Sequence, residues 1–156
     1  MATSRIPAAI EALVTRWTAA LPGVLVLDGP TTGDLTKVQD LVFVGWQPNT
    51  ENGLAVEMQQ DFAHIGGHTR DERFDVLCYL EAWTGDFDIN ARRARAFELF
   101  AACENDLRAS GGNPSAPNLG GAVLFSGITQ GSLLQQQTDR GATVGIAFRV
   151  TCQARI

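Results

Sequence analysis

The sequence predicts an α+β fold: a mixed, mostly antiparallel sheet with two main helices packed on it and a long C-terminal strand. Predicted strands cluster between and after the predicted helices. They do not alternate with helices one for one, which favours α+β over a doubly wound α/β fold. A chain of 156 residues suits one hydrophobic core, so we expect residues 1–156 to form a single domain.

The longest periodic segment is residues 142–156. From Val144 to Ile156 every even position is apolar, whereas the odd positions are small or polar. Side chains alternate across a strand, so this pattern predicts a strand with one buried face. At roughly 3.3 Å per residue the strand would span about 45 Å. We expect it to run past its neighbours and to offer an unpaired end to another molecule.

Two segments have the apolar spacing of amphipathic helices. The first is residues 6–21, with Ser4 as its cap and Pro22-Gly23 at its end. The second is residues 88–109, and Gly111-Gly112 is expected to end it. Its predicted buried positions are Ile89, Ala96, Phe97, Phe100, Ala101, Cys103 and Leu107.

Shorter apolar or alternating segments predict the remaining strands, at residues 24–27, 40–46, 54–62, 73–83, 123–129 and 133–138. Residues 73–83 are apolar on both faces, so we expect both faces to be covered. Residues 63–72, with Gly66-Gly67 in the middle, are predicted to form a loop. A short turn at 139–141 is predicted to join the last two strands as a hairpin.

The overall charge disfavours binding to nucleic acid. Twelve Lys and Arg residues stand against 17 Asp and Glu residues, a formal net charge of −5, and no run of four basic residues occurs. An acidic surface repels phosphates. The first residues carry charges and lack the apolar core of a secretory signal, and no apolar run is long enough to predict a membrane span.

The cysteines are expected to be free. Cys78, Cys103 and Cys152 are odd in number, widely spaced and embedded in apolar segments, which argues against a disulfide framework. We expect buried thiols, as in a protein made in a reducing cytoplasm.

The sequence contains only weak candidates for catalytic groups. His64 and His68 have the spacing of two metal ligands on a helix, but Gly66-Gly67 lies between them, and we favour incidental histidines in a solvated loop. Asp86 and Asp88 follow a strand, and capping of the second helix accounts for both. Because no nucleophile elbow or phosphate-binding glycine motif occurs, we expect no enzyme activity, cofactor or metal.

Two polar segments are candidates for contacts with a partner. Arg92, Arg93 and Arg95 form the densest basic cluster, which is either a solvated helix face or a contact to an acidic partner. The glutamines Gln135, Gln136 and Gln137 lie on a strand that is polar on both faces. Such a strand is either closed by another subunit or simply exposed, and the sequence leaves both interpretations open.

Several segments together resemble a known family. They are the first strand VLVLDG, then DLVFVGW, RDERFDVLCYLEAWTGD, the helix ARRARAFELFAACENDLRA and the closing hairpin QQQTDRGATVGIAFRVTCQARI. In this order they are similar to the tail terminator, or tail completion, proteins of long-tailed bacteriophages. The resemblance covers nearly the whole chain, and its motifs are diffuse and contain no catalytic fingerprint.

The resemblance implies a small α+β subunit of a hexameric ring in the virion tail or neck, made in the host cytoplasm. The ring would cap the tail tube, end its polymerisation and meet the head-side connector. The implied partners are further copies of the chain, the major tail tube protein and the connector or stopper protein, while DNA passes through without specific binding. We take nine residues as the candidate subunit or lumen interface: Arg92, Arg93, Gln135, Gln136, Gln137, Arg149, Thr151, Gln153 and Arg155.

The sequence is also compatible with two other functions. Another neck component, such as a head-completion or connector protein, belongs to the same class but has different partners. A small metal-dependent hydrolase using His64, His68 and nearby carboxylates is the less favoured alternative, because the ligand set is incomplete.

Overall fold

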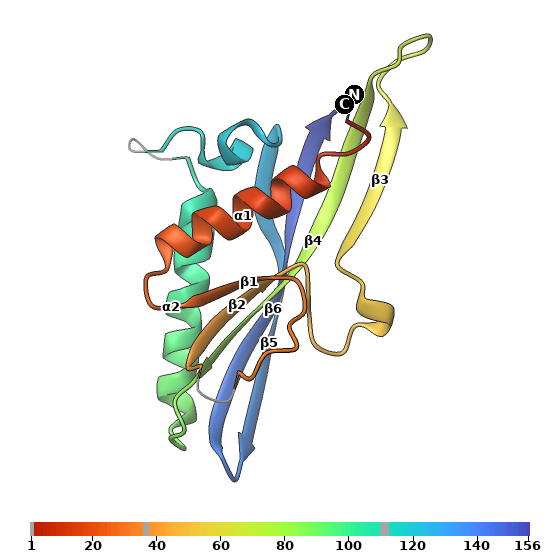
Figure 1. The fold of residues 1–156 in the computed structure, drawn as a ribbon. Helices are drawn as coiled ribbons and strands as arrows, with labels where there is room; N and C mark the ends of the chain where they lie inside the picture. The colour runs from red at the N-terminus through yellow and green to blue at the C-terminus, as the bar shows by residue number, and fades with distance from the viewer. Residues whose placement is uncertain (1, 36–37, 110–112) are drawn as a thin grey trace.

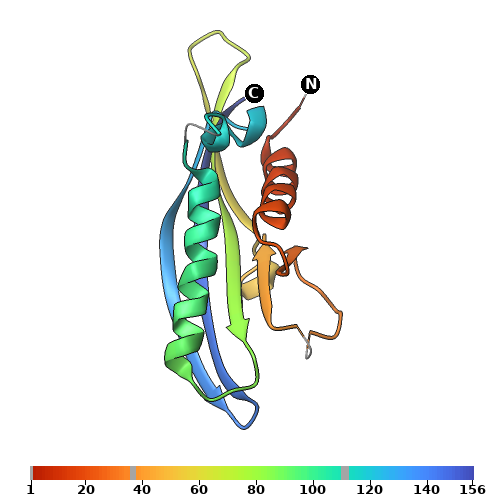
Figure 2. The same cartoon turned by 90° about the vertical axis from the view of Figure 1, so that its left-hand side faces the viewer.

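The computed structural model describes residues 2–35, 38–109 and 113–156, and it confirms the α+β class. Two main helices lie on one face of a six-stranded sheet (Figure 1, Figure 2). The elements, in chain order, are α1 (Ile6–Ala20), β1 (Leu25–Asp28), β2 (Asp40–Val44), the 3-10 turn η1 (Glu51–Gly53), β3 (Val56–Phe62), β4 (Arg70–Trp83), α2 (Ile89–Leu107), the 3-10 turn η2 (Ala116–Gly121), β5 (Phe125–Thr138) and β6 (Gly141–Arg155).

The sheet has the strand order β1-β2-β4-β6-β5, and β3 also pairs with β4. Only β1 and β2 are parallel, and the other pairs are antiparallel. Along the side of β4 away from β6, β3 pairs with the first half of β4 and β2 with the second half. The two long central strands β4 and β6 therefore take part in every strand pair except that between β1 and β2.

β6 has partners on both sides, so the predicted overhang is wrong. Its residues 143–155 pair with β4 and its residues 141–153 pair with β5. The predicted gap between two short strands at 123–129 and 133–138 is instead a register shift between Ile128 and Gln130 within the single strand β5. Because a bulge keeps the strand paired on either side, β5 follows β6 over nearly its full length.

The loop before β4 is shorter than predicted. β4 begins at Arg70, which pairs with Phe62 at the end of β3, and Ala63 N donates to Thr69 O at 3.0 Å. The cross-strand partners on β3 extend the strand into residues whose own sequence indicates a loop. The result is a long β3–β4 hairpin whose tip projects from one end of the molecule (Figure 1).

The main core lies between the helices and the sheet. As predicted, the even positions of β6 from Val144 to Ala154 are buried beneath the helices. The fully buried Trp17 of α1 packs against Phe148 of β6 at a ring distance of 5.9 Å, and Phe100 of α2 packs against the same ring at 5.3 Å. One phenylalanine ring thus joins both helices to the centre of the sheet.

The buried side of α2 differs in part from the prediction. Phe97 and Ala101 were expected in the core, but both are exposed, Phe97 to 47%, while Leu99 is buried. The buried residues follow three- and four-residue steps, from Ala96 through Leu99 and Cys103 to Leu107, so the helix is turned slightly relative to the expected stripe. Phe97 lies at the border of the stripe, beside Phe100.

The helix ends are held by polar contacts. Asp88 Oδ1 accepts from Ala91 N at 3.1 Å, which confirms the predicted cap of α2. Ser4 Oγ accepts from Ile6 N at 3.0 Å at the start of α1. The buried Glu72 of β4 accepts from Arg5 N at 2.8 Å, which ties this helix end to the sheet. The predicted stop at Gly111-Gly112 lies outside the described residues.

All three cysteines are free and buried, as predicted. Burial raises the pKa of the Cys103 and Cys152 thiols to about 12, and it raises that of Cys78 further. Thiols with such pKa values are unreactive at neutral pH. In the described part of the chain, no helix combines the length and apolarity needed to cross a bilayer.

Candidate functional site

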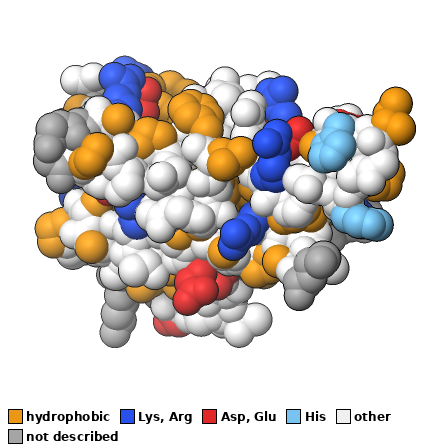
Figure 3. All heavy atoms as spheres, turned by 90° about the horizontal axis from the view of Figure 1, so that it is seen from above, with side chains coloured by type: hydrophobic (Ala, Val, Ile, Leu, Met, Phe, Trp, Pro, Cys, Tyr) orange, Lys and Arg blue, Asp and Glu red, His pale blue; other side chains and the backbone are white. Residues whose placement is uncertain are grey.

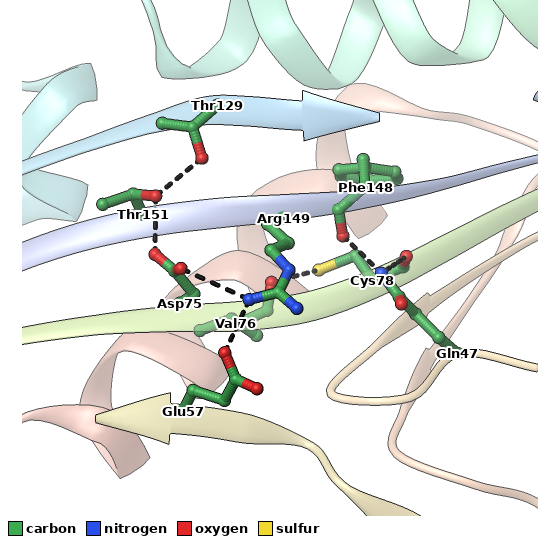
Figure 4. Close-up of polar contacts among 9 residues, drawn as sticks. All are labelled: Gln47, Glu57, Asp75, Val76, Cys78, Thr129, Phe148, Arg149 and Thr151. Carbon is green, nitrogen blue, oxygen red and sulfur yellow. Dashed lines mark hydrogen bonds and ion pairs between the residues drawn. The ribbon is translucent and has the colours of Figure 1, made fainter. Parts of the chain in front are cut away.

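The candidate residues on β6 lie on the face of the sheet opposite the helices, which we call the open face. Their own subunit already engages most of them. Arg149 Nη1 lies 2.6 Å from Glu57 Oε2 of β3 and 3.6 Å from Asp75 Oδ2 of β4 (Figure 4). These ion pairs cross three neighbouring strands, so Arg149 links β3, β4 and β6 within one copy.

Thr151 was expected at a surface but is buried. Its Oγ1 donates to Asp75 Oδ1 at 2.6 Å, and its other contact is the Thr129 hydroxyl at 2.7 Å (Figure 4). A chain of hydroxyl and carboxylate groups therefore runs from β5 across β6 to β4. Thr151 lies on the open face, as its place in the alternating pattern predicts, but Asp75 and Thr129 cover its side chain. It therefore belongs to the subunit's own hydrogen-bond network.

The last two candidates on β6 are exposed. Arg155 Nε pairs with Asp71 Oδ1 at 2.6 Å, an ion pair in which both side chains are about half exposed. Such a pair contributes little to stability. Gln153 is also exposed and makes no side-chain hydrogen bond to the described residues, so it is the β6 candidate most available to a partner.

The three glutamines of β5 divide between the two faces. Gln135 Oε1 accepts from Arg93 Nε at 2.7 Å, and Gln137 Nε2 donates to Phe87 O at 2.9 Å, so both are tied to the start of α2. Gln136 lies on the open face, opposite Thr143 of β6. The structure thus brings together two predicted site residues, Arg93 and Gln135, which the sequence separates by 42 positions.

The other arginines of α2 also have intramolecular partners. Arg92 Nε lies 3.6 Å from Asp86 Oδ1, and Arg95 pairs with Asp40 and Glu98, both at 3.0 Å. The cluster is therefore neither a free basic patch nor a fully solvated face. It connects α2 to β2 and to the turn after β4.

A groove that sequence reasoning missed lies on the open face. One wall is formed by Leu35, Phe43 and Trp46, and β5 forms the other wall. The groove has a volume of about 520 Å³. Phe43 and Trp46 pack with ring centroids 4.5 Å apart, and both contact the ring of Tyr79, at 6.3 Å and 6.0 Å.

The floor of the groove carries a carboxylate in a largely apolar setting. Tyr79 Oη donates to Glu81 Oε2 at 3.0 Å. Burial raises the pKa of Glu81, an effect that the tyrosine hydrogen bond only partly opposes, and burial with the nearby carboxylate raises the pKa of Tyr79. No Lys, Arg or His of the described chain pairs with Glu81. Burial of a carboxylate without a charged partner is unfavourable, so Glu81 is a candidate contact for a donor from outside the subunit.

One signal in the sequence pointed toward this groove. The two-faced strand 73–83 was expected to be covered on both sides, and Leu77 and Tyr79 are indeed buried on the open face. The cover is not a second layer of elements. It is a small cluster in which Leu27, Leu35 and Val38 pack near Tyr79.

His64 and His68 do not form a metal-binding arrangement with other described residues. His64 and His68 are exposed in the β3–β4 tip, and Asp71 is engaged with Arg155. Within residues 2–35, 38–109 and 113–156, no group of three or more His, Cys, Asp or Glu side chains is arranged to hold a metal ion. Asp86 and Asp88 are used at the start of α2, where Asp86 also accepts from the Thr84 hydroxyl at 2.9 Å.

Comparisons with known proteins give no family assignment. No protein-family model matches the chain, and no curated protein sequence matches it.

Proposed function

We propose that this protein is a ring-forming structural subunit of the tail-terminator type. In this role it caps the tail tube of a long-tailed bacteriophage and meets the head-side connector. The proposal rests on the sequence resemblance and on one structural observation. Residues 129–138 of β5 form an exposed edge strand, and the segment 123–138 contains no charged residue or proline.

An edge strand of this kind favours association. Native sheets normally protect their edges with charges, prolines or short strands. β5 has 14 residues, and in the described chain its only strand partner is β6. Its single bulge lies near the start, which leaves a long stretch of backbone groups for a partner strand. Pairing along such an edge is one way in which a subunit assembles with copies of itself.

The acidic balance is compatible with a passage for DNA. The formal net charge of −5 opposes tight binding of phosphates along a channel. In the proposed role the subunit acts by binding and by shape. It positions backbone and side-chain contacts for neighbouring subunits and performs no chemical step.

The first test is the assembly state and location of the protein. We expect a ring in light scattering coupled to size-exclusion chromatography, either alone or with tail tubes, and the protein in purified particles by electron microscopy. Strictly monomeric protein that never co-purifies with tails would contradict the proposal.

A gene deletion separates a terminator from another neck protein. Loss of a terminator is expected to give overlong tails, because tube polymerisation is no longer stopped. Loss of a head-side neck component would instead leave tails of normal length unattached to heads. Elemental analysis of the purified protein tests the hydrolase alternative, which would require a stoichiometric metal that a His64→Ala, His68→Ala double variant loses.

A further inference from the structure

The tip of the β3–β4 hairpin exposes an unusual apolar side chain. Ile65 is completely exposed, at 104% of its reference area, and Phe62 at the end of β3 is 73% exposed. The tip extends beyond the end of β6, where Ile156 exchanges backbone hydrogen bonds with Arg70. A fully exposed isoleucine on a projecting hairpin has unfavourable contact with water, which contact with another surface would remove.

The tip also carries hydrogen-bond donors and no acid. Residues 62–70 include His64, His68 and Arg70 but no Asp or Glu. Viewed from above, the pale-blue histidine side chains lie at the same side of the molecule as several apolar side chains (Figure 3). The ring of His64 lies over Gly67, in the space that a Cβ would occupy, so the loop has a packed shape. Both imidazoles lack hydrogen-bond partners among the described residues.

The open-face groove has the matching chemistry. Its walls are apolar and aromatic, and its floor presents the Glu81 carboxylate, which accepts only the Tyr79 hydroxyl within the described chain. Phe43 and Trp46 offer an apolar surface to an isoleucine, and an imidazole N–H is a hydrogen-bond donor that suits the carboxylate. The tip thus offers an exposed apolar side chain and hydrogen-bond donors, and the groove offers apolar walls and a hydrogen-bond acceptor.

The tip and the groove of one copy cannot meet. They lie at opposite ends of the sheet, because the tip precedes Arg70 at the start of β4 whereas Glu81 lies near its end. Eleven positions along a strand correspond to about 36 Å. Contact therefore requires a second molecule. In a ring such as that of the proposed function, the tip and the groove of one copy meet different neighbours, so the contact is head-to-tail.

We propose that the β3–β4 tip of one copy docks into the open-face groove of a second copy, with Ile65 against Phe43, Trp46 and Tyr79 and a tip imidazole on Glu81. This contact requires the self-association that is part of the proposed function. It does not require binding to a phage tail. The exposed strand β5 borders the groove through Leu134 and Gln136, so a neighbour bound along that strand also has access to the groove.

Disulfide trapping tests the contact directly. The native cysteines are buried, so an Ile65→Cys, Gln136→Cys double variant introduces the accessible thiols. Under mild oxidation we expect intermolecular disulfides that form a ladder of covalent oligomers on a non-reducing gel. The matched control is Ile65→Cys with Gln153→Cys, which places the second thiol on the open face at the tip end of the sheet. Equal cross-linking in the control, or none in the test variant, overturns the proposal.

Two single variants test its energetics. Ile65→Asp changes a solvent-exposed side chain, and Glu81→Gln keeps an acceptor for Tyr79, so both are expected to fold. Each should raise the concentration for half-assembly about tenfold or more, measured by light scattering. A mixture of the two retains one competent pairing, the tip of the Glu81 variant in the groove of the Ile65 variant. The mixture should therefore form heterodimers without longer assemblies.

The outcomes separate this contact from the proposed function. Wild-type assemblies that persist unchanged in both variants, without the Ile65–Gln136 cross-link, overturn the contact alone. Strictly monomeric protein that forms no cross-links and never co-purifies with tails overturns both the contact and the ring. Tip-to-groove cross-links in a protein absent from virions would support the contact and remove the tail-terminator role.

Discussion

The ring of Tyr79 occupies the space beside Gly145 that a Cβ at this position would need. Glycine lets the tyrosine of β4 lie flat across β6, where it meets Phe43 and Trp46 and directs its hydroxyl to Glu81. The groove on the open face therefore depends on glycine at position 145 of β6, which leaves room for the Tyr79 ring.

Replacing Gly145 with alanine should disturb the aromatic cluster. The new methyl group would displace the Tyr79 ring, and we expect the free energy of unfolding in urea to fall by about 1–3 kcal/mol, as for other overpacked sites. Gly131→Ala is the matched control, because a Cβ there meets its nearest atom at 3.8 Å. Equal stabilities for the two variants would contradict this role of Gly145.

Glu72 is expected to make folding sensitive to acid. Burial alone would raise its pKa, but hydrogen bonds from Ser4, the Arg5 backbone and Gln60 outweigh burial and hold the pKa below its ordinary value of 4.5. A lowered folded-state pKa gives stability that is present above pH 4.5 and is lost as the pH falls through the folded-state value.

Glu72→Gln should therefore be less stable than wild type at neutral pH, by about 1–3 kcal/mol, because a buried charge-assisted contact is lost. The difference should shrink below pH 4.5. Denaturant unfolding at several pH values measures it, with the exposed Glu98→Gln as control. A difference that does not change with pH would exclude the carboxylate as its source.

Glu81 should have the opposite effect. Its pKa is raised by burial, so its favourable contribution is present below the ordinary value of 4.5 and is lost as the pH rises through the folded-state pKa. Glu81→Gln should raise the free energy of unfolding at neutral pH by about 1 kcal/mol. The gain should vanish in acid. A destabilised variant at neutral pH would show that the carboxylate has an unrecognised partner.

New negative charges on the open face should separate structural from partner-facing residues. Arg149→Glu places a third carboxylate beside Glu57 and Asp75, and we expect a loss of about 1–3 kcal/mol in unfolding free energy. Gln153→Glu should leave stability within about 0.5 kcal/mol, since Gln153 is exposed. If Gln153→Glu also leaves assembly unchanged in light scattering, this end of β6 is not an interface.

A charge on the edge strand should block association without unfolding the subunit. Ser132→Lys adds a cation to the exposed, uncharged stretch of β5, and native proteins use lysine at such edges for protection. We expect monomers in light scattering and an unchanged urea midpoint. The control is Asp139→Lys, which changes charge at the turn next to the strand. Normal assembly of Ser132→Lys would mean that β5 is not the association edge.

The sequence was sufficient to predict features that depend on local periodicity. Both helices, the buried even positions of β6 and the cap at Asp88 follow from spacing or from residue chemistry. The overhang of β6 was predicted wrongly because Gln130 and Gly131 look like an interruption, whereas the structure accommodates them beside a bulge within a paired strand. Which residues pair across strands is a non-local property, and a single strand's pattern does not contain it.

The groove lay beyond prediction for the same reason. Phe43, Tyr79 and Gly145 come from three separate strands, and nothing in their sequence spacing places them together. Likewise, Arg149 and Thr151 have the polar character of surface residues. Whether such residues face a partner or their own sheet depends on Glu57 and Asp75, which arrive from β3 and β4.

The central position of β6 has a consequence for biosynthesis. β6 leaves the ribosome after every other described strand, yet it separates β4 from β5 in the sheet. Contacts such as that between Arg155 and Asp71 join residues 84 positions apart, so the sheet cannot be completed until this segment has been synthesised. Until then β4 and β5 both have an unfilled edge. The nascent chain is therefore most exposed to mispairing with other chains just before β6 inserts between them.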